Sequence, residues 1–272
     1  MCGRFIQIID IESLVKRFGV KHPEQVSVQS NFNVAPGDYA YVITSNKPDE
    51  LQAFQFAFTP SWAQKKMYLI NARAEGDLNK ENDPNYDGEM GILKKPSFRT
   101  SIKSKRCLVI ASGYYEGPEV EKLDKPFYIS KKNNEVFTFA GIWDTWIDPN
   151  TGEVSNTFGI ITVAPNSVSQ QIGHHRSPLV LDKKDEQKWL DPKLPIEELL
   201  GLLKPYPGEE FKAEAISIKV KNPRNKGQDL IIPIDSKGPS EYDISVKQSL
   251  KLQGMGQNKR KEKPPPQQGS LF

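Results

Sequence analysis

Residues 106–115, RCLVIASGYY, form a short β-type run, and segments of this kind decide the fold class of the chain. Similar runs lie on both sides of it, several of them alternate apolar with polar residues, and Gly, Pro, Asn and Asp separate them. They are YAYVIT (39–44), LQAFQFAF (51–58), KPFYIS (125–130), EVFTFAGIW (135–143), TFGIITV (157–163) and FKAEAISIKV (211–220). The pattern predicts that most of the chain forms a β-sheet.

Helical patterns interrupt these runs. Residues 11–19 place four apolar side chains on one helical face after Asp10, a candidate N-cap, and residues 185–190 and 196–203 are also helical in pattern. Residues 76–96 are polar and predict a long loop with one helical turn. Short strands and scattered helices do not suit parallel crossovers, so we predict a single α+β domain over residues 2–240. Its core is expected to be a largely antiparallel, barrel-like sheet flanked by short helices.

Residues 254–272, GMGQNKRKEKPPPQQGSLF, carry few apolar residues before the last two and cannot build a core, so we predict a disordered tail. Four basic residues against Glu262 give this tail a charge of 4 − 1 = +3, which equals the net charge of the whole chain. The remaining residues are therefore neutral overall. A nucleic-acid partner would need a local basic groove.

Composition excludes several classes of protein. The chain has 272 residues, of which 37% are hydrophobic and 26% charged, as in an ordinary soluble protein. No apolar run is long enough for a membrane span, and the start lacks the build of a signal peptide. Two cysteines make no disulfide framework, so we expect a reducing, cytoplasmic location. The cysteines and three histidines lack metal-ligand spacing and no Gly-rich phosphate loop is present, so we expect no metal or other cofactor. We also expect the chain to be a monomer.

Cys2 follows the initiator Met1, and a small second residue is the usual condition for removal of that methionine. The new terminus would carry an α-amine with a pKa near 8 and a thiol with a pKa near 8.5 on one residue. The amine can condense with an aldehyde to an imine, and the thiol can then close a five-membered thiazolidine ring. Taken alone, Cys2 is equally a small residue beside the start codon.

Four further blocks accompany the MCGRF start: NFNVAPG (31–37) followed by TPSWA (59–63), INARAEG (70–76), RCLVIASGYYEG (106–117) and IGHHRSPLVL (172–181). Together, and in this order, they resemble the SOS-response-associated peptidase family over roughly residues 2–235. The resemblance implies recognition of abasic sites in single-stranded DNA during replication-associated repair. It further implies a covalent thiazolidine crosslink through Cys2, with lyase and auto-peptidase activities left open.

The resemblance also assigns roles to residues. The family's Cys-Gly-Arg start falls on Cys2, the crosslinking residue, and on Arg4. Asn71 would hold the deoxyribose and the N-terminal residue, and Arg73 would bind a phosphate.

Further roles fall on residues later in the blocks. Glu116 would act as a proton shuttle and His174 as a second proton-transfer group, with Arg176 two residues later. Trp62 would lie close to the DNA path, and no role falls on His175.

These residue types suit the chemistry. A carboxyl such as that of Glu116, buried at the end of an apolar strand, is expected to have a raised pKa and to exchange protons during opening of the sugar. His174 is expected to titrate near neutrality. Arg4, Arg73 and Arg176 offer forked donors to phosphates, and Trp62 or Tyr115 offers a stacking face. Such a site would recognise backbone and shape with little preference for base sequence.

Each residue alone also has a structural interpretation. Asn71 and Arg73 could form a turn and a surface ion pair, Glu116 could cap a loop, and His174 and Trp62 could be core residues. Cys107 is expected to be a buried strand residue without function.

Three departures from the family pattern concern the shape of the DNA channel. Gly117 stands where a Trp is usual, Ser177 stands where Met is common, and FQFAFTPSW (54–62) replaces a Trp-Gly-rich segment.

Two other functions compete with crosslinking. The first is an N-terminal-nucleophile peptidase with Cys2 as nucleophile and His174 as base. The second is a non-catalytic nucleic-acid adaptor that uses the basic tail.

The last five residues, QGSLF, resemble the peptide by which many bacterial replication and repair proteins bind the sliding clamp. Leu271 and Phe272 would fill an apolar pocket while Gln268 bonds at its edge, and the preceding Lys- and Pro-rich segment would act as a tether. A frayed terminus with two apolar residues explains the same sequence.

Overall fold

The computed structural model describes residues 3–22 and 27–234. Cys2 and the tail at residues 254–272 lie outside these described residues, as does the predicted end of the domain at residue 240. No helix among the described residues is both long enough and apolar enough to span a membrane.

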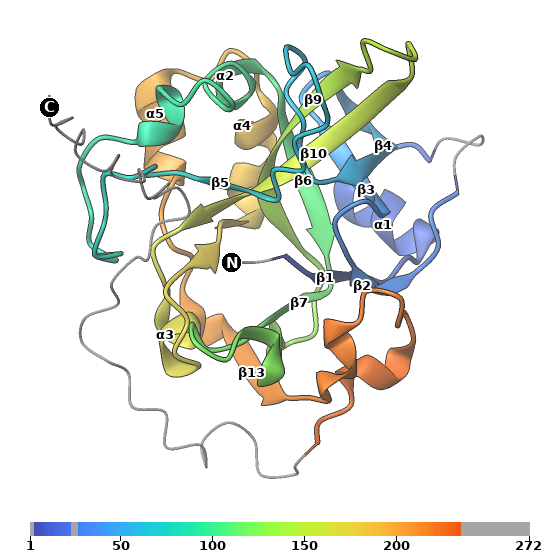
Figure 1. Ribbon diagram of the computed structural model, residues 1–272, viewed down its shortest axis with the longest axis vertical. Helices are drawn as coiled ribbons and strands as arrows, with labels where there is room; N and C mark the ends of the chain where they lie inside the picture. Colours follow the sequence, from blue (N-terminus) through green and yellow to red (C-terminus); the bar gives the residue numbers. More distant parts are fainter. Residues whose placement is uncertain (1–2, 23–26, 235–272) are drawn as a thin grey trace, which may run out of the picture.

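A closed barrel of five strands forms the centre of the molecule (Figure 1). Its members are β3 (Tyr39–Thr44), β4 (Lys47–Phe56), β6 (Arg106–Ala111), β9 (Phe137–Ile147) and β10 (Val154–Val163). The barrel closes because β10 pairs antiparallel with β9 on one side and parallel with β4 on the other. Its remaining pairings are antiparallel, which confirms the predicted barrel-like, largely antiparallel core. Three short strands extend this sheet: β5 (Asn71–Arg73) and β11 (Ser177–Pro178) along β10, and β12 (Val180–Leu181) along β9.

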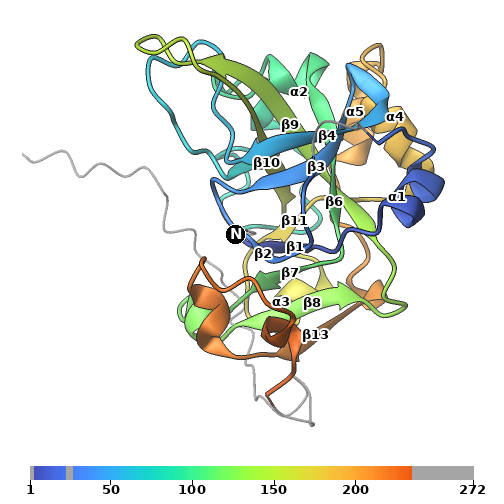
Figure 2. The same cartoon turned by 90° about the vertical axis from the view of Figure 1, so that its right-hand side faces the viewer.

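A second sheet of five strands packs below the barrel, as Figure 2 shows. Its order is β13 (Phe211–Ala215), β8 (Phe127–Lys131), β7 (Gly113–Glu116), β1 (Phe5–Gln7) and β2 (Asn31–Val34). The run at residues 106–117 therefore serves both sheets, because it bends at Ser112 between β6 and β7. This bend carries the chain from the barrel to the second sheet.

The two faces of the barrel strands belong to two hydrophobic clusters. On β6, Cys107 and Val109 pack into the cluster that the barrel shares with the second sheet, whereas Leu108 and Ile110 face the cluster under the helices. Because successive side chains of a strand point to opposite faces, both faces of β6 are buried. This explains why its sequence is almost continuously apolar. The ring of Phe5 joins the two sheets through edge-to-face contacts with Phe56 and Phe139. The ring centroids of these pairs are 5.4 and 6.1 Å apart.

The helices are short. Four of the described α-helices lie around the barrel, whereas α3 (Ser167–Gln171) lies beside the second sheet (Figure 2). The predicted first helix is confirmed as α1 (Ile11–Phe18), and Gly19 ends it with a φ of 66°. Asp10 occupies the N-cap position, but its carboxylate accepts a hydrogen bond from the Ser13 hydroxyl and caps no backbone N–H. The remaining α-helices are α2 (Ser101–Ser104), α4 (Glu186–Leu190) and α5 (Ile196–Leu202).

Short 3-10 helices complete the structure. They are η1 (Gly91–Leu93), η2 (Lys122–Asp124), η3 (Lys183–Asp185), η4 (Gly208–Glu210), η5 (Ile218–Lys221) and η6 (Gln228–Ile231). η1 is the single helical turn predicted in the loop at residues 76–96. The prediction of one strand over residues 211–220 is wrong in its second half, which forms η5. There Val220 packs with Leu230 and Ile6 on the outer face of the second sheet, so burial on that face replaces strand pairing.

Candidate functional site

The pairing of β1 with β7 brings the start of the chain beside Glu116. Phe5 pairs with Tyr114, and the next residue along β7, Tyr115, donates its backbone N–H to the carbonyl oxygen of Arg4 at 3.0 Å. The antiparallel register therefore directs the first described residue, Gly3, toward the end of β7 that carries Glu116. The predicted crosslinking residue, Cys2, lies outside the described residues.

Glu116 and His174 are brought together from segments far apart in the sequence. Both side chains are buried, and His174 Nε2 lies 3.5 Å from Glu116 Oε2. His174 Nδ1 lies 2.9 Å from the carbonyl oxygen of Gly117. Because a carbonyl oxygen only accepts, Nδ1 must carry the hydrogen. In the neutral imidazole, Nε2 then has a lone pair facing the carboxyl.

Burial shifts the proton equilibria of both groups toward their neutral forms. It raises the pKa of the Glu116 carboxyl, as expected from the sequence. It lowers the pKa of His174 well below the ordinary value of 6.5, so the expectation that this histidine titrates near neutrality is wrong. A protonated carboxyl at Glu116 can donate to Nε2 of a neutral His174. In this arrangement the pair is neutral, and release of its proton leaves a negative charge on the Glu116 carboxylate.

Gly117 has a steric reason to be glycine. A Cβ atom at this position would overlap the carbonyl oxygen of Lys122 and lie 2.9 Å from that of Lys125. The segment that contains η2 thus folds against the α-carbon of Gly117, where the resemblance leads one to expect a tryptophan. This close approach leaves the Gly117 carbonyl free to orient His174.

Two arginines converge on a carboxylate that the sequence analysis did not single out. Arg176, only 2% exposed, donates to Glu75 Oε2 at 2.6 Å and to the carbonyl oxygen of Thr162 at 2.7 Å. Arg73 lies half-buried beside it, with Nε 3.9 Å from the same Glu75 oxygen. Glu75 also accepts the backbone N–H of Ala164 at 2.9 Å. The signal for Glu75 was its place in the INARAEG block.

The environments of the two arginines differ. Arg73 donates to the Asn82 side chain at 2.9 Å and to the carbonyl of Asn79. Burial, followed by the neighbouring charge of Arg176, lowers the pKa of Arg73 to about 10, which leaves it charged at neutral pH. Arg176 lies in the interior and its charge is already paired, so its role as a phosphate ligand remains a prediction. The geometry instead suits it to holding Glu75 and Arg73 in place.

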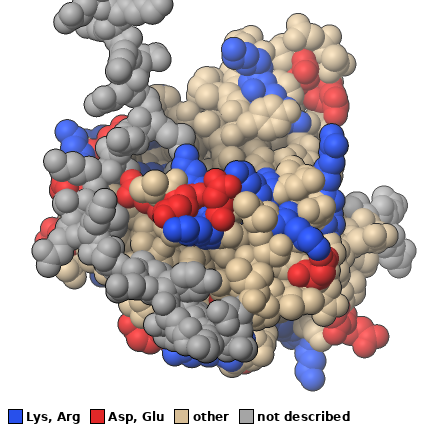
Figure 3. Space-filling view, turned by 60° about the horizontal axis from the view of Figure 1, so that its bottom comes forward, with Lys and Arg blue, Asp and Glu red and all other residues tan. Residues whose placement is uncertain are grey.

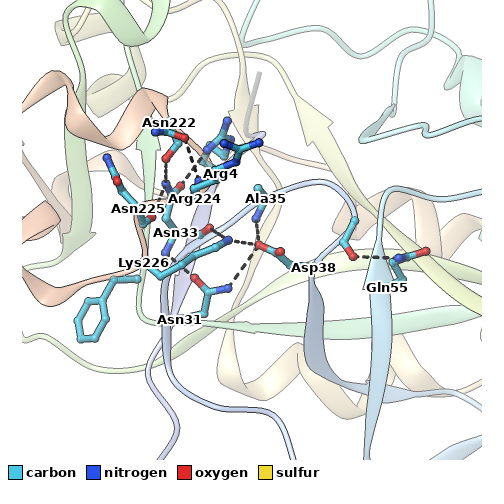
Figure 4. Close-up of polar contacts among 12 residues, drawn as sticks. Arg4, Asn31, Asn33, Ala35, Asp38, Gln55, Asn222, Arg224, Asn225 and Lys226 are labelled. Carbon is cyan, nitrogen blue, oxygen red and sulfur yellow. Dashed lines mark hydrogen bonds and ion pairs between the residues drawn. The ribbon is translucent and has the colours of Figure 1, made fainter.

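Arg4 lies in a network of polar contacts that joins the second sheet to the segment at residues 220–226 (Figure 4). Its guanidinium donates to Asn33 Oδ1 at 3.2 Å and to the carbonyl oxygen of Lys221 at 3.3 Å. The side-chain nitrogen of Asn33, which carries two hydrogens, lies 3.0, 3.1 and 3.0 Å from the carbonyl oxygens of Val220, Asn222 and Asn225 in this segment. Asn33, from the NFNVAPG block, is thus a positioning residue that the sequence analysis missed.

The remaining predicted residues lie on different parts of the structure. Asn71 opens β5, half-buried, opposite Ile160 of β10. Trp62 is 55% exposed in the loop between β4 and β5, which rules out a buried core role. The expectation that Tyr115 could offer a stacking face is wrong, because its ring is buried in the hydrophobic cluster on the second sheet. Cys107 is fully buried and burial raises the pKa of its thiol, as expected for a residue without chemistry. Among the described residues, no cluster of His, Cys, Asp and Glu is suited to a metal ion.

The visible surface carries charges of both signs. On the face shown in Figure 3, Lys and Arg side chains alternate with Asp and Glu side chains instead of forming one broad basic patch. On this face, binding of an anionic strand would therefore depend on individual arginines and lysines. This agrees with the near-neutral charge of the chain outside its tail.

Comparison with known proteins gives consistent matches. The family model described as SOS response associated peptidase matches residues 1–223. A protein of Bacillus subtilis named abasic site processing protein YoqW is 31% identical over 239 residues, covering 85% of this chain and 99% of its own. The chicken abasic site processing protein HMCES is 30% identical, covering 82% of this chain and 70% of its own. A solved structure from Bacteroides thetaiotaomicron superposes with a TM-score of 0.70 at 30% identity, covering 85% of this chain and 99% of that one.

Proposed function

Because this chain belongs to the SOS response associated peptidase family, we propose that it processes abasic sites in DNA. Curated relatives carry that activity in their names. We further propose that the substrate is single-stranded and that the product is a covalent crosslink. In this crosslink Cys2, freed by removal of Met1, forms a thiazolidine ring with C1′ of the abasic sugar.

The buried pair of Glu116 and His174 is the observation that carries this proposal. It lies at the end of β7, and the neighbouring strand β1 leads back to Cys2. Consecutive α-carbons are about 3.8 Å apart, so the α-carbon of Cys2 lies within about 7.6 Å of that of Arg4. Arg4 is hydrogen-bonded to Tyr115, the residue before Glu116. This connectivity supports the proposal that the pair serves the amine and thiol of Cys2.

The reaction proceeds in three steps whose atoms balance. The sugar first opens to its aldehyde when a proton moves from the C1′ hydroxyl to the ring oxygen. The α-amine of Cys2 then adds to C1′, and the carbinolamine hydroxyl leaves as water with a proton from Glu116. Loss of that water leaves an iminium, whose nitrogen keeps its hydrogen. Finally the Cys2 sulfur adds to the iminium carbon while the thiol proton passes to the Glu116 carboxylate, which restores the starting protonation.

Other residues position the strand in this proposal. Asn71 holds the deoxyribose, and Arg73 and Arg4 bind phosphates. To do so, each of the two arginines must exchange part of its hydrogen bonding within the protein for hydrogen bonds to the phosphate. Trp62 offers an exposed ring for a base. Arg176 acts as a positioning residue through Glu75 and Arg73.

The test uses the two cysteines as a matched pair. Purified protein is incubated with a single-stranded oligonucleotide containing one abasic site, and intact mass is measured. We expect loss of Met1 and addition of one oligonucleotide minus one water in a heat-stable adduct. Cys107→Ala should react as wild type. Cys2→Ala should retain only an imine that borohydride traps, so a stable Cys2→Ala adduct without reductant would exclude the thiazolidine.

The same experiment separates the competing functions. An N-terminal tag left in place turns the amine into an amide and should abolish the adduct. An acyl-enzyme on Cys2 with an ester substrate, without an oligonucleotide adduct, would instead indicate a peptidase. Binding that persists unchanged in Cys2→Ala, again without any adduct, would indicate a non-catalytic adaptor. Strand cleavage by Cys2→Ser would reveal a lyase reaction.

We also propose that the chain acts as a cytoplasmic monomer tethered to a bacterial sliding clamp by its last residues. Gln268, Leu271 and Phe272 lie outside the described residues, so this proposal rests on their sequence alone. Tethering would raise the local concentration at stalled forks, where template is single-stranded. A peptide of residues 257–272 should bind a sliding clamp, and a Leu271→Ala, Phe272→Ala peptide should not. Equal binding of both peptides would contradict the tether.

A further inference from the structure

The loop at residues 59–68, here called the aromatic loop, leaves the barrel through a narrow neck. Strands β4 and β5 both run parallel to β10, β4 at Thr157 and Phe158 and β5 from Ile160 to Thr162. The chain between them is pinched where Phe58 and Leu69 exchange both backbone hydrogen bonds at 2.9 Å. Gly159 faces this neck, and a Cβ there would lie 3.0 Å from that of Phe58.

A strained residue precedes each partner of the neck. Ala57 has a φ of 93° and Tyr68 a φ of 53°, in the region that glycine favours. For Tyr68, the Cβ atom makes this conformation costly, and the residue is 53% exposed, so little burial offsets the cost. Strain of this kind, retained at an exposed aromatic residue, indicates a use for the ring outside the fold.

The backbone that presents this ring is fixed by contacts with neighbouring strands. The N–H of Ser61 donates to Asp144 at 2.8 Å, and the carbonyl oxygen of Ala63 accepts the indole N–H of Trp146 at 2.7 Å. Near the other end of the loop, the N–H of Met67 donates to the Thr59 hydroxyl at 3.3 Å. The exposed rings therefore start from an ordered scaffold, which lowers the entropic cost of binding a ligand.

A cation accompanies the ring. Lys66 Nζ lies 5.6 Å from the centroid of the Tyr68 ring and donates to Gln55 Oε1 at 2.5 Å. An aromatic face beside a positive charge suits a nucleotide, because the base can stack while the phosphate pairs with the ammonium. Asn71 follows three residues after Tyr68, so their α-carbons are at most about 11 Å apart along the chain. This span corresponds to about one or two nucleotides of an extended strand.

We propose that Tyr68 and Lys66 form a second subsite for single-stranded DNA, in which a nucleobase flanking the abasic nucleotide stacks on Tyr68 and a phosphate pairs with Lys66. The subsite rests on the proposed function and extends it from the damaged nucleotide to its neighbour. It explains why a tyrosine occupies a backbone conformation that favours glycine. With this subsite, the aromatic loop presents two exposed rings, those of Trp62 and Tyr68, to one DNA strand.

The experiment measures binding of the full chain to a fluorescein-labelled, single-stranded oligonucleotide without abasic sites, by fluorescence anisotropy. Tyr68→Ala and Tyr68→Gly both remove the ring and should weaken binding by about 5- to 100-fold. They differ in strain, so Tyr68→Gly should melt about 2–4 °C above Tyr68→Ala. Tyr68→Phe keeps the ring and should bind as wild type. Lys66→Gln should reduce the slope of log affinity against log salt by about 0.7.

Two readouts keep this inference separable from the proposed function. Wild-type binding by both Tyr68→Ala and Tyr68→Gly would overturn the subsite, as would failure of the wild-type protein to bind the intact oligonucleotide. Crosslinking by the wild-type protein is measured separately, with a saturating abasic oligonucleotide. If the wild-type protein binds intact DNA through Tyr68 but forms no adduct, crosslinking is wrong and the subsite stands.

Discussion

His174 and Glu116 face each other across 3.5 Å, and the residue that follows Glu116 determines how they do so. Gly117 accepts the Nδ1 hydrogen of His174, which leaves the Nε2 lone pair toward the carboxyl. Two adjacent residues therefore supply the acid, which is the Glu116 carboxyl, and the carbonyl group of Gly117 that orients His174. Burial disfavours the charged form of each group, so it raises the pKa of Glu116 and lowers the pKa of His174.

Glu116→Gln tests the role of that proton. Glutamine keeps the size of the side chain but does not titrate, so the rate of adduct formation should fall by about 10²- to 10⁴-fold. The rate is measured as the single-turnover appearance of adduct on a denaturing gel. Affinity for an intact oligonucleotide should change little. A Glu116→Gln rate equal to that of the wild type would remove Glu116 from the mechanism.

Gly117→Ala tests the close approach of η2 to Gly117. The added methyl group overlaps the carbonyl oxygen of Lys122, a backbone atom that a rotamer change cannot move. We therefore expect the free energy of unfolding to fall by at least about 2 kcal/mol. Urea unfolding measures the loss. Gly201→Ala is the matched control, because a Cβ at Gly201 meets no atom within 4 Å. Equal stability of the two variants would contradict the packing described here.

His175 gives a prediction for pH dependence. Burial and the neighbouring His174 lower the pKa of His175 to about 3, so between pH 6.5 and pH 3 the unfolded chain binds the proton more readily. Its contribution to stability is complete above pH 6.5 and is lost as the pH falls toward 3. His175→Asn should therefore reduce the slope of unfolding free energy against pH by up to about 1.4 kcal/mol per unit. Denaturant titrations between pH 4.5 and 7.5 measure this slope, and parallel curves would contradict the assignment.

Glu75→Gln tests the buried ion pair with Arg176. Removing the carboxylate leaves the Arg176 charge in the interior without a counter-charge, which should cost about 3–5 kcal/mol of stability. Glu75→Leu combined with Arg176→Met removes both charges and should cost less than the sum of the single changes. A double-mutant cycle by urea unfolding measures this coupling, and additive losses would show that the pair is not coupled.

Ala57→Gly tests strain at the neck of the aromatic loop. Glycine adopts a φ of 93° without a Cβ clash, and relief of about 1–3 kcal/mol should exceed the ~0.5–1 kcal/mol cost of its flexibility in the unfolded chain. We expect a net gain near 1 kcal/mol, seen as a higher melting temperature. Because no ring is removed, DNA binding should stay at the wild-type level. A lower melting temperature would show that the buried methyl group outweighs the strain.

Local sequence determined those elements whose stability depends on near neighbours and on periodic burial. The apolar stripe at residues 11–18 and Gly19 are enough to start and stop α1, and the apolar run at residues 106–111 indicates a strand buried on both faces. The same reasoning failed at residues 216–220, which alternate like a strand. There η5 forms because Val220 packs on the second sheet, a contact that no local pattern encodes.

The sequence also determined which residue types the site contains, and it predicted the raised pKa of Glu116. Tertiary structure alone decided that His174, far along the chain, lies against that carboxyl and is too buried to titrate near neutrality. It also decided that Arg176 forms a buried ion pair with Glu75, and that Tyr68 has a strained backbone and lies exposed on the surface. The physical reason is that pKa values, ion pairing and exposure depend on desolvation and on the distances between remote segments. Strand pairing determines the desolvation and these distances only when the whole barrel has closed.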